Sequence, residues 1–530
     1  RSSAISGTDR PTADTEDDMS RPNILFLLSD EHSHRFMGHV SRENGGEPVD
    51  TPTFDRLAAE GTVFTDAYCQ MPLCTPSRLS LLSGREVRGA GAWGNNSVMR
   101  PGIATLPGTL ADAGYETCLV GKMHLGGSRQ YVGFQHRPYG DLTGKTGHQA
   151  DPISDPEART MRGRTATAVG VTEIPESLLQ EQVVAQETVA WIREHEAAKP
   201  NKPWFLMASF SRPHFPLTAP RRWIERYSPD DITEPMAPAG GDAYDHPMSV
   251  GMRKGFGADA IEHDEMMRAR ASYFACVSYL DELLGDLLTR LEATGQLNNT
   301  IIVYTSDHGE LAGEHGAWWK NAWYEACTRV PLIVSTPAQR AAGAGGRTET
   351  PVGLVDLFPT LCAMADVEPP TDLDGRDLSG TVVHGEALPD RPVFCDALSP
   401  RWGQGTEFRM VRWGKYKYVR FRDAPSLLFD VEADPLEQHD LVASGSASDA
   451  LSYLAGVVDE TMDFTDAEHA RQRDDELAAE YPLDAPASAG NLYHMPDGRV
   501  VNAEAALYDP TTIAESAGDI ASDFPPRRED

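Results

Sequence analysis

The sequence predicts an α/β protein with a mainly parallel central sheet flanked by helices and a smaller C-terminal antiparallel α+β subdomain. Short apolar segments alternate with segments of helical periodicity, which is typical of a parallel sheet covered by helices. Four of the apolar segments end in clusters of polar, reactive residues. After about residue 385 the pattern changes to short alternating strands separated by turns, which indicates a separate antiparallel sheet.

The four apolar segments are expected to be buried strands, and the residues that follow them are the first functional candidates. Because ligands bind at the carboxyl edge of open α/β sheets, we expect the four clusters to meet there. The segments are 23–29, followed by Asp30 and Glu31; 116–120, followed by Lys122 and His124; 204–210, followed by Arg212 and His214; and 300–306, followed by Asp307 and His308.

The remaining elements are assigned from periodicity and stop signals. Residues 135–180 and 228–258 show little periodicity, and we expect a long surface loop or lid in the first and an irregular insertion in the second. A further strand is expected over 330–334, and helices over 53–60, 106–113, 182–197, 260–293 and 357–365. In the C-terminal part, strands are expected over 408–413, 415–421 and 427–430.

The predicted domain organisation has four parts. Residues 1–20 are expected to be a disordered lead or tag, because they are polar and lack periodicity. A catalytic domain over 21–385 is followed by a C-terminal subdomain over 386–484 and a polar extension over 485–530.

Composition excludes several classes of partner. The chain has 530 residues and a net charge of -33, which argues against nucleic acid or an anionic membrane as a partner. No apolar run reaches the roughly 18 residues needed to span a bilayer. Residues 1–18 lack the apolar core of a signal peptide, which favours a cytoplasmic over a secreted location. A signal peptide cleaved from further upstream is the alternative. Seven cysteines without CxxC pairs indicate neither a disulfide framework nor a zinc cage.

The stretch 72–85 has the features of an anion site beside a reactive side chain. Pro76 is suited to the first position of a short helix and Gly84 to its end. Cys74 then lies just ahead of the helix N-terminus, where free N–H groups and the helix dipole favour negative charge. Arg78 lies one turn further on and can fold back toward the same point.

Two neighbouring strand ends supply candidate ligands for a divalent metal such as Ca²⁺ or Mg²⁺. The alternative is a pair of unrelated acidic turns, which are common after strands. We favour the metal site because Cys74, Lys122 and His214 are predicted to lie at the same edge of the sheet. The candidate ligands are Asp30, Glu31, Asp307 and His308.

The other strand ends supply groups for anion binding and proton transfer. Lys122 and His124 are two residues apart on an extended segment, so their side chains are expected to point the same way; the alternative is a solvated loop pair. His214 stands between two prolines, and a lone histidine of this kind is usually structural. Trp318 and Trp319 precede Lys320 and could be core residues or a platform for a substrate ring or cation.

These residues carry a resemblance to a known family. Residues 74–78 (CTPSR) with 82–85 (LSGR) are similar to the signature of the type I sulfatases. In this family, which is related to alkaline phosphatase, the cysteine of the signature is oxidised to Cα-formylglycine. The similarity covers roughly residues 21–445 in order. It implies an alkaline-phosphatase-like sulfatase fold with a C-terminal subdomain.

The resemblance also implies roles for individual residues. Cys74 would become formylglycine, whose hydrate attacks sulfur and then releases sulfate. Arg78 and His124 would hold the hydrate, and Lys122, Lys320 and His214 would bind the sulfate oxygens, with His214 as the acid for the leaving alcohol. Asp30, Asp307, His308 and the modified Cys74 would ligate one divalent metal, with Ca²⁺ preferred over Mg²⁺ or Mn²⁺.

Three positions depart from the family pattern. Glu31 stands where the family has a second Asp or a Gln, which puts its role as a ligand in question. His308 stands where many members have Asn, and Ser83 stands where Thr is usual.

The sequence therefore predicts a sulfate ester hydrolase that is matured by a formylglycine-generating enzyme and can form a homo-oligomer. The long insertions favour a sulfated carbohydrate as substrate, with Trp318, Trp319 and Arg212 as candidate contacts. The alternatives are a choline-sulfatase or a phosphonate monoester or phosphodiester hydrolase on the same site. A binding protein whose Cys74 stays unmodified is the non-enzymatic alternative.

Overall fold

The computed structural model describes residues 21–40, 45–140, 160–161, 167–172, 174–482, 492–494 and 500–502. The predicted lead over 1–20 lies outside the described residues. So does the predicted 485–530 extension, apart from β19 (Leu492–His494) and β20 (Val500–Asn502), which pair antiparallel.

The four predicted strands lie side by side in the centre of one sheet. They are β10, β1, β8 and β4, which run parallel to one another, as the sequence predicts. The sheet is mainly parallel, since only β12 runs against its neighbours. In order, its eight strands are β13 (Gly346–Thr348), β2 (Thr62–Phe64), β12 (Leu332–Ser335), β10 (Thr300–Ser306), β1 (Asn23–Asp30), β8 (Trp204–Pro213), β4 (Glu116–Gly121) and β5 (His136–Tyr139).

The strand register brings the polar clusters to one edge. Ser29 of β1 pairs with Ser306 of β10, so Asp30 and Asp307 follow the sheet at the same level. On the other side Gly121 of β4 pairs with Ser209 of β8. The clusters after four strands are therefore neighbours in space, although they are far apart in the sequence.

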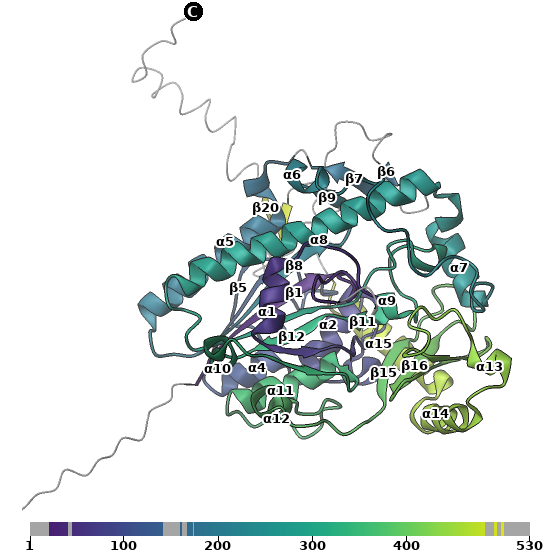
Figure 1. Cartoon of the computed structure of the whole chain (residues 1–530). Coiled ribbons are helices and arrows are strands. Elements are labelled where there is room, and N and C mark those ends of the chain that lie inside the picture. The colour runs from purple at the N-terminus through teal and green to yellow at the C-terminus, as the bar shows by residue number, and fades with distance from the viewer. Residues whose placement is uncertain are drawn as a thin grey trace, which may run out of the picture.

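Side chains on alternate sides of β1 fill two separate cores. Leu25 and Leu27 pack with α1 (Pro52–Ala59), α5 (Gln180–Ala198) and α8 (His263–Glu292), and Figure 1 shows α5 and α8 running across this face. The residues between them pack with α2 (Cys74–Ser83), α4 (Leu106–Asp112) and α11 (Leu357–Met364) on the opposite face. Each fully buried large apolar side chain contributes roughly 1.5–3 kcal/mol.

Two segments that were expected to be irregular contain regular structure. Within 135–180, β5 joins the edge of the sheet, and β7 (Thr167–Val171) pairs with β9 (Leu217–Ala219). Within 228–258, α7 (Pro247–Phe256) forms because Pro247 suits the first helical position and the His246 ring caps the N–H of Met248. Short helices that start at a proline leave too little periodicity to recognise in the sequence.

The strand predicted over 330–334 is divided in two at Pro331, which has no N–H to donate. β11 (Arg329–Val330) pairs with β3 (Ala67–Tyr68), which also pairs with β14 (Val352–Gly353). The other short elements are α3 (Val87–Ala90), β6 (Thr160–Met161), α6 (Arg221–Ile224), α9 (Glu325–Thr328), α10 (Pro337–Ala342) and α12 (Ser379–His384).

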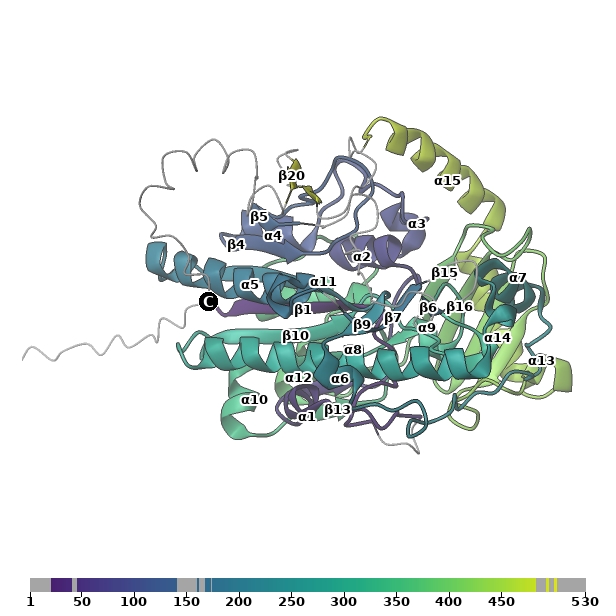
Figure 2. The same ribbon diagram turned by 90° about the horizontal axis from the view of Figure 1, so that it is seen from above.

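The C-terminal part forms the predicted antiparallel sheet. Its strands are β15 (Val393–Ala397), β16 (Phe408–Trp413), β17 (Tyr416–Phe421) and β18 (Leu427–Asp430), joined in sequence order. The helices α13 (Leu441–Ser444), α14 (Ser448–Thr461) and α15 (Phe464–Ala479) follow them. Figure 2 shows these elements together with α7 at one end of the molecule. None of the helices in the described residues is long and apolar enough to cross a membrane.

A buried ion network joins this sheet to the catalytic part. Lys417 of β17 lies 3.0 Å from Glu325 of α9 and 2.7 Å from Glu437, and Glu437 accepts the N–H of Glu325 at 2.7 Å. Arg412 of β16 lies 3.0 Å from Asp66. Removing one partner of such a buried group leaves an uncompensated charge, which typically costs about 3–5 kcal/mol.

Glu437 makes the stability of this junction pH-dependent. Burial raises its pKa against the effect of Lys417, and Glu325 raises it further, to about 7. An acid with a raised pKa binds its proton more tightly in the folded state, so its stabilising effect is lost as the pH rises through the folded pKa. We expect Glu437→Gln to remove this loss, so the stability of wild type relative to the variant should fall between about pH 5 and about pH 8.

Urea unfolding over that pH range measures the difference. Glu432→Gln is the matched control, because Glu432 is an exposed glutamate in the segment after β18 that also contains Glu437. A stability difference between wild type and Glu437→Gln that stays constant with pH would contradict the expectation.

Candidate active site

Cys74 is the first residue of α2. The preceding residue, Leu73, is extended, and its carbonyl accepts the N–H of Ser77 at 3.1 Å. The helix therefore begins two residues before the predicted start at Pro76. Its end is as predicted, because Gly84 has a φ of 63° in the left-handed region, which glycine adopts without strain. Every residue of this helix is buried, so Cys74 is held in a rigid environment.

Arg78 connects the four strand ends. Its Nε lies 2.8 Å from an Asp307 carboxylate oxygen, and one terminal nitrogen lies 3.0 Å from Asp30. Its other terminal nitrogen donates to the Lys122 carbonyl at 2.6 Å and to the Ser209 hydroxyl at 3.0 Å. Burial alone would lower the pKa of Arg78, but Asp307 and Asp30 raise it above its ordinary value. The guanidinium is therefore a permanent charge that orients both carboxylates.

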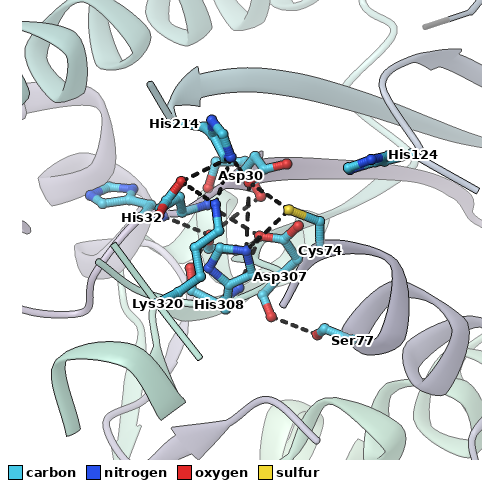
Figure 3. Close-up of polar contacts among 12 residues, drawn as sticks. Asp30, His32, Cys74, Ser77, His124, His214, Asp307, His308 and Lys320 are labelled. Atoms are coloured by element: carbon cyan, nitrogen blue, oxygen red, sulfur yellow. Dashed lines mark hydrogen bonds and ion pairs between the residues drawn. The ribbon is translucent and has the colours of Figure 1, made fainter. Parts of the chain in front are cut away.

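Four potential metal ligands converge beside this arginine (Figure 3). Cys74 Sγ lies 3.3 Å from His308 Nε2 and 3.5 Å from Asp30 Oδ1. His308 Nε2 lies 3.7 Å from carboxylate oxygens of both Asp30 and Asp307. Two carboxylates and one imidazole, all buried, fit a divalent cation that prefers oxygen ligands. The structure thus brings together four of the five predicted ligand residues.

Glu31 lies with a different pair of side chains. Its φ of 66° lies in the left-handed region directly after Asp30. The Asp30 and Glu31 carboxylates form a second group of potential ligands with His214, whose atoms lie within 4.8 Å of one another. Glu31 Oε2 lies 2.6 Å from Lys320 Nζ and 3.1 Å from His214 Nε2, and the Lys320 and His214 nitrogens lie 2.6 Å apart. Burial raises the pKa of Glu31 well above its ordinary value despite Lys320. Glu31 therefore orients the lysine–histidine pair in this structure.

The cationic groups surround Cys74. Lys122 Nζ lies 2.5 Å from Asp30, and Lys320 and His214 approach the same carboxylate side from another direction (Figure 3). Burial and Asp30 would raise the pKa of the Cys74 thiol, but Lys320, Lys122 and His308 outweigh them and lower it to about 5. An unmodified Cys74 is then a thiolate at neutral pH, and the pocket favours negative charge at this position.

His124 lies on the other side of Cys74 from the carboxylates (Figure 3). The segment after β4 is not extended, because Gly121 and His124 have φ values of 96° and 55°. The side chains of Lys122 and His124 therefore do not point the same way, in contrast to the prediction. The His124 carbonyl accepts the Thr75 hydroxyl, which ties this segment to the first turn of α2.

The three candidate substrate contacts are buried. Trp318 and Trp319 are 2% and 1% exposed and belong to the core, which was the alternative interpretation of this pair. Arg212 is ion-paired with Glu181 and donates to the Thr218 carbonyl at 2.8 Å. None of the three presents a free face to a substrate in this structure.

Three further polar residues support the site, and of these only Ser77, which lies inside the 74–78 motif, has a recognisable signal in the sequence. Ser77 donates to the Asp307 carbonyl at 2.5 Å, and Ser209 accepts from Arg78. Asn95 accepts the N–H of Thr75 at 3.2 Å and so supports the turn that carries Cys74. Single serines and asparagines are common in any chain, and only their partners in space distinguish Ser209 and Asn95.

Comparison with known proteins identifies the family. A family model described as sulfatase matches residues 22–367, and one described as N-sulphoglucosamine sulphohydrolase, C-terminal, matches residues 313–460. The chain belongs to the sulfatase family, whose members hydrolyse sulfate esters, and its fold is the one the sequence resemblance implies.

Individual relatives cover most of the chain. A choline-sulfatase from Rhizobium meliloti is 31% identical over 79% of this chain and 81% of its own. An ulvan-active sulfatase from Formosa agariphila is 27% identical over 81% of this chain and 79% of its own. Among solved structures, the phosphonate monoester hydrolase of Agrobacterium radiobacter matches with a TM-score of 0.70 at 23% identity, covering 86% of this chain and 96% of that one. This last similarity shows a shared fold.

The geometry of the two acidic neighbours leads to a prediction about metal content. Asp30 belongs to the four-ligand cluster, whereas Glu31 belongs only to a second group of potential ligands with Asp30 and His214. We expect Asp30→Asn to lower the metal affinity at least about tenfold. Substituting a residue that only hydrogen-bonds to a metal ligand already lowers the affinity by about that factor. Glu31→Gln should retain the metal. Elemental analysis of the dialysed proteins measures both, and equal metal loss in the two variants would make Glu31 a ligand after all.

Proposed function

We propose that the protein hydrolyses a sulfate ester by means of a formylglycine made from Cys74, with one divalent metal. The observation that carries the proposal is the convergence on Cys74 Sγ of Asp30 and His308 at 3.5 and 3.3 Å, with Lys122 and Lys320 alongside. Side chains that stabilise negative charge at one buried atom are suited to a reaction in which negative charge develops on a sulfate group.

Asp30, Asp307, His308 and the modified Cys74 would hold the metal. The oxygen-rich donor set favours Ca²⁺, with Mg²⁺ or Mn²⁺ as alternatives. A metal in this position would polarise a bound oxygen and stabilise its negative charge. Formylglycine would supply a hydrated aldehyde as nucleophile in place of a weak alcohol. Its formation requires a formylglycine-generating enzyme in the host.

The chain's own cations would bind the sulfate group. Lys122 and Lys320 are both buried, and Glu31 and the Cys74 thiolate raise the pKa of Lys320 against the effect of burial. Their ammonium groups can neutralise sulfate oxygens without reorganisation during the reaction. Arg78 is fully engaged by Asp30 and Asp307, so its role is to hold the carboxylates in place.

His214 is suited to donate the proton to the leaving alcohol. Its Nδ1 lies 2.7 Å from the Phe215 carbonyl, which can only accept, so Nδ1 carries a proton. This leaves Nε2 directed at Lys320 and Glu31, on the side of the pocket where the sulfate would bind. A proton delivered from the doubly protonated ring leaves a neutral imidazole, whose Nε2 then accepts a hydrogen bond from Lys320. His124, beside Cys74 on the opposite side, is the candidate base that would take a proton from the hydrate during sulfate release (Figure 3).

A sulfated carbohydrate is the proposed substrate class. One relative is described as an ulvan-active sulfatase. Phe256 of α7, within the 228–258 insertion, packs 4.7 Å from Trp319, which directly precedes Lys320. The Trp318–Trp319 pair, which suited a choline cation equally well, is in the core. The choline-sulfatase relative keeps choline sulfate as the second candidate substrate.

Replacing Cys74 tests the chemistry. Cys74→Ala should reduce turnover of an aryl sulfate on the order of 10³-fold or more, because it removes the precursor of the nucleophile. Cys276→Ala is the matched control, since Cys276 is equally buried but lies in α8. Mass spectrometry of the 69–85 peptide from a host competent for maturation should show an aldehyde at Cys74. An unmodified thiol in fully active protein would refute the mechanism.

A substrate panel separates the remaining alternatives. We expect kcat/KM to be highest for sulfated saccharides, lower for choline sulfate and lowest for an aryl phosphonate monoester, each assayed with the same preparation. Choline sulfate turnover above that of every saccharide would replace the carbohydrate assignment, and preferred phosphonate turnover would make the protein a phosphonate hydrolase on the same site.

A further inference from the structure

The backbone on both sides of Lys320 is in the left-handed region. Trp319 and Asn321 each have a φ of 68°. Asparagine adopts this region readily, but a bulky residue such as tryptophan does so only at a cost in free energy. A left-handed tryptophan therefore persists only where the surrounding structure holds it. At the centre of this turn, Lys320 Nζ lies 2.6 Å from both Glu31 Oε2 and His214 Nε2.

Glu310 is the side chain that holds the Trp319 backbone. Its Oε1 accepts the N–H of Trp319 at 2.5 Å and the N–H of Ala312 at 2.9 Å. Glu310 is 2% exposed, so water has little access to replace either bond. One buried carboxylate oxygen thus joins the two ends of the loop that leads to Lys320.

The turn is attached on its other side to the segment of Cys74. The N–H of Asn321 donates to the Pro72 carbonyl at 2.9 Å, and Pro72 lies two residues before Cys74. The residues before and after Lys320 are therefore both held by hydrogen bonds, one to Glu310 and one to the Cys74 segment. Fixing the backbone on both sides fixes the direction in which the Lys320 side chain leaves it.

The middle of the loop between Glu310 and Lys320 is anchored separately. Glu314 lies there, is 1% exposed, and stands 3.0 Å from Arg35 and 3.5 Å from Arg270 of α8. Removing the Glu310 carboxylate should therefore loosen the end of the loop that carries the lysine and leave its middle in place.

We propose that Glu310 is a positioning residue, which holds Trp319 in the left-handed conformation that directs Lys320 to the sulfate group. This role rests on the proposed function, in which Lys320 binds the sulfate, and it adds a residue that does not itself touch the substrate. The competing explanation is an effect of charge on Glu31. Burial raises the pKa of Glu31, and the nearby Glu310 carboxylate raises it further.

Three variants of Glu310 separate position from charge. Glu310→Gln keeps an acceptor oxygen without the charge, Glu310→Asp keeps the charge on a shorter side chain, and Glu310→Ala removes both. A displacement of about 1 Å in an active site can lower the rate about 10²-fold. We expect Glu310→Asp and Glu310→Ala to lower kcat/KM for 4-nitrocatechol sulfate by this order, and Glu310→Gln to stay within about threefold of wild type. Full activity of Glu310→Asp with loss in Glu310→Gln would overturn the proposal.

The same substitutions in a Lys320→Ala background show whether Glu310 acts through the lysine. Two residues that act through one contact have effects that do not add. We expect Glu310→Ala to lower the residual kcat/KM of the Lys320→Ala protein by less than about twofold. An equal factor in both backgrounds would mean that Glu310 acts on another part of the site, which overturns the proposal.

Asp281→Ala is the matched control for a loss of stability alone. Asp281 of α8 is 1% exposed and accepts the N–H groups of Thr53 and Phe54 at 3.0 and 2.8 Å, so it is also a buried carboxylate that binds two backbone donors. Its substitution should lower the midpoint of urea unfolding and leave kcat/KM within about twofold of wild type. An activity loss equal to that of Glu310→Ala would overturn the proposal in favour of a structural role.

A crystal structure of Glu310→Ala tests the geometry without turnover, and Glu310→Asp takes its place if the alanine variant does not fold. We expect the φ of Trp319 to leave the left-handed region and Lys320 Nζ to move away from His214. An unchanged turn would overturn the proposal. Failure of wild type to turn over any sulfate ester would count against the proposed function alone.

Discussion

The site depends on one buried arginine. Arg78 donates hydrogen bonds to both carboxylates of the ligand cluster. It also donates to the Lys122 carbonyl and to the Ser209 hydroxyl of β8. Asp30 and Asp307 lie close together without solvent, and such a pair would repel without a charge between them. The guanidinium compensates them and fixes their orientation at once, because its planar donors have fixed directions. The neighbouring strand ends can thus present several charges to a single point.

The balance of charge inside the pocket differs from that of the whole protein. The chain carries a net charge of -33, yet Lys122, Lys320 and Arg78 gather around Cys74. Each cation has a carboxylate partner, which makes its burial tolerable. Glu31 holds Lys320 and His214 in one group while Asp30 and Asp307 serve the ligand cluster. Asp30 belongs to both groups, because Lys122 is paired with it.

The C-terminal subdomain is structurally part of the active site. The buried ions around Lys417 join its sheet to α9, and the Trp402 indole N–H donates to the carbonyl of Asn321, which directly follows Lys320. Buried ion networks of this kind favour one relative placement of two units, since displaced partners would leave charges unpaired.

Much of the architecture follows from local pattern. Four apolar segments with polar ends predicted the parallel strands and the edge where they meet, because strand burial and the carboxyl-edge rule need no tertiary information. The motif around Cys74 likewise predicted a helix N-terminus at this cysteine, and Cys74 is the first residue of α2. The helix α7 and strand β5 were missed, since short elements with proline starts or edge positions carry weak periodicity.

The sequence by itself determined the class of protein, the sheet and the residues that reach its active edge. Tertiary structure alone decided how those residues divide their work. Glu31 follows Asp30 directly, but its carboxylate is paired with Lys320. Trp318 and Trp319 precede Lys320, but they are core residues. Neighbours in sequence share a backbone but not a direction, and directions are set by the packing of distant segments.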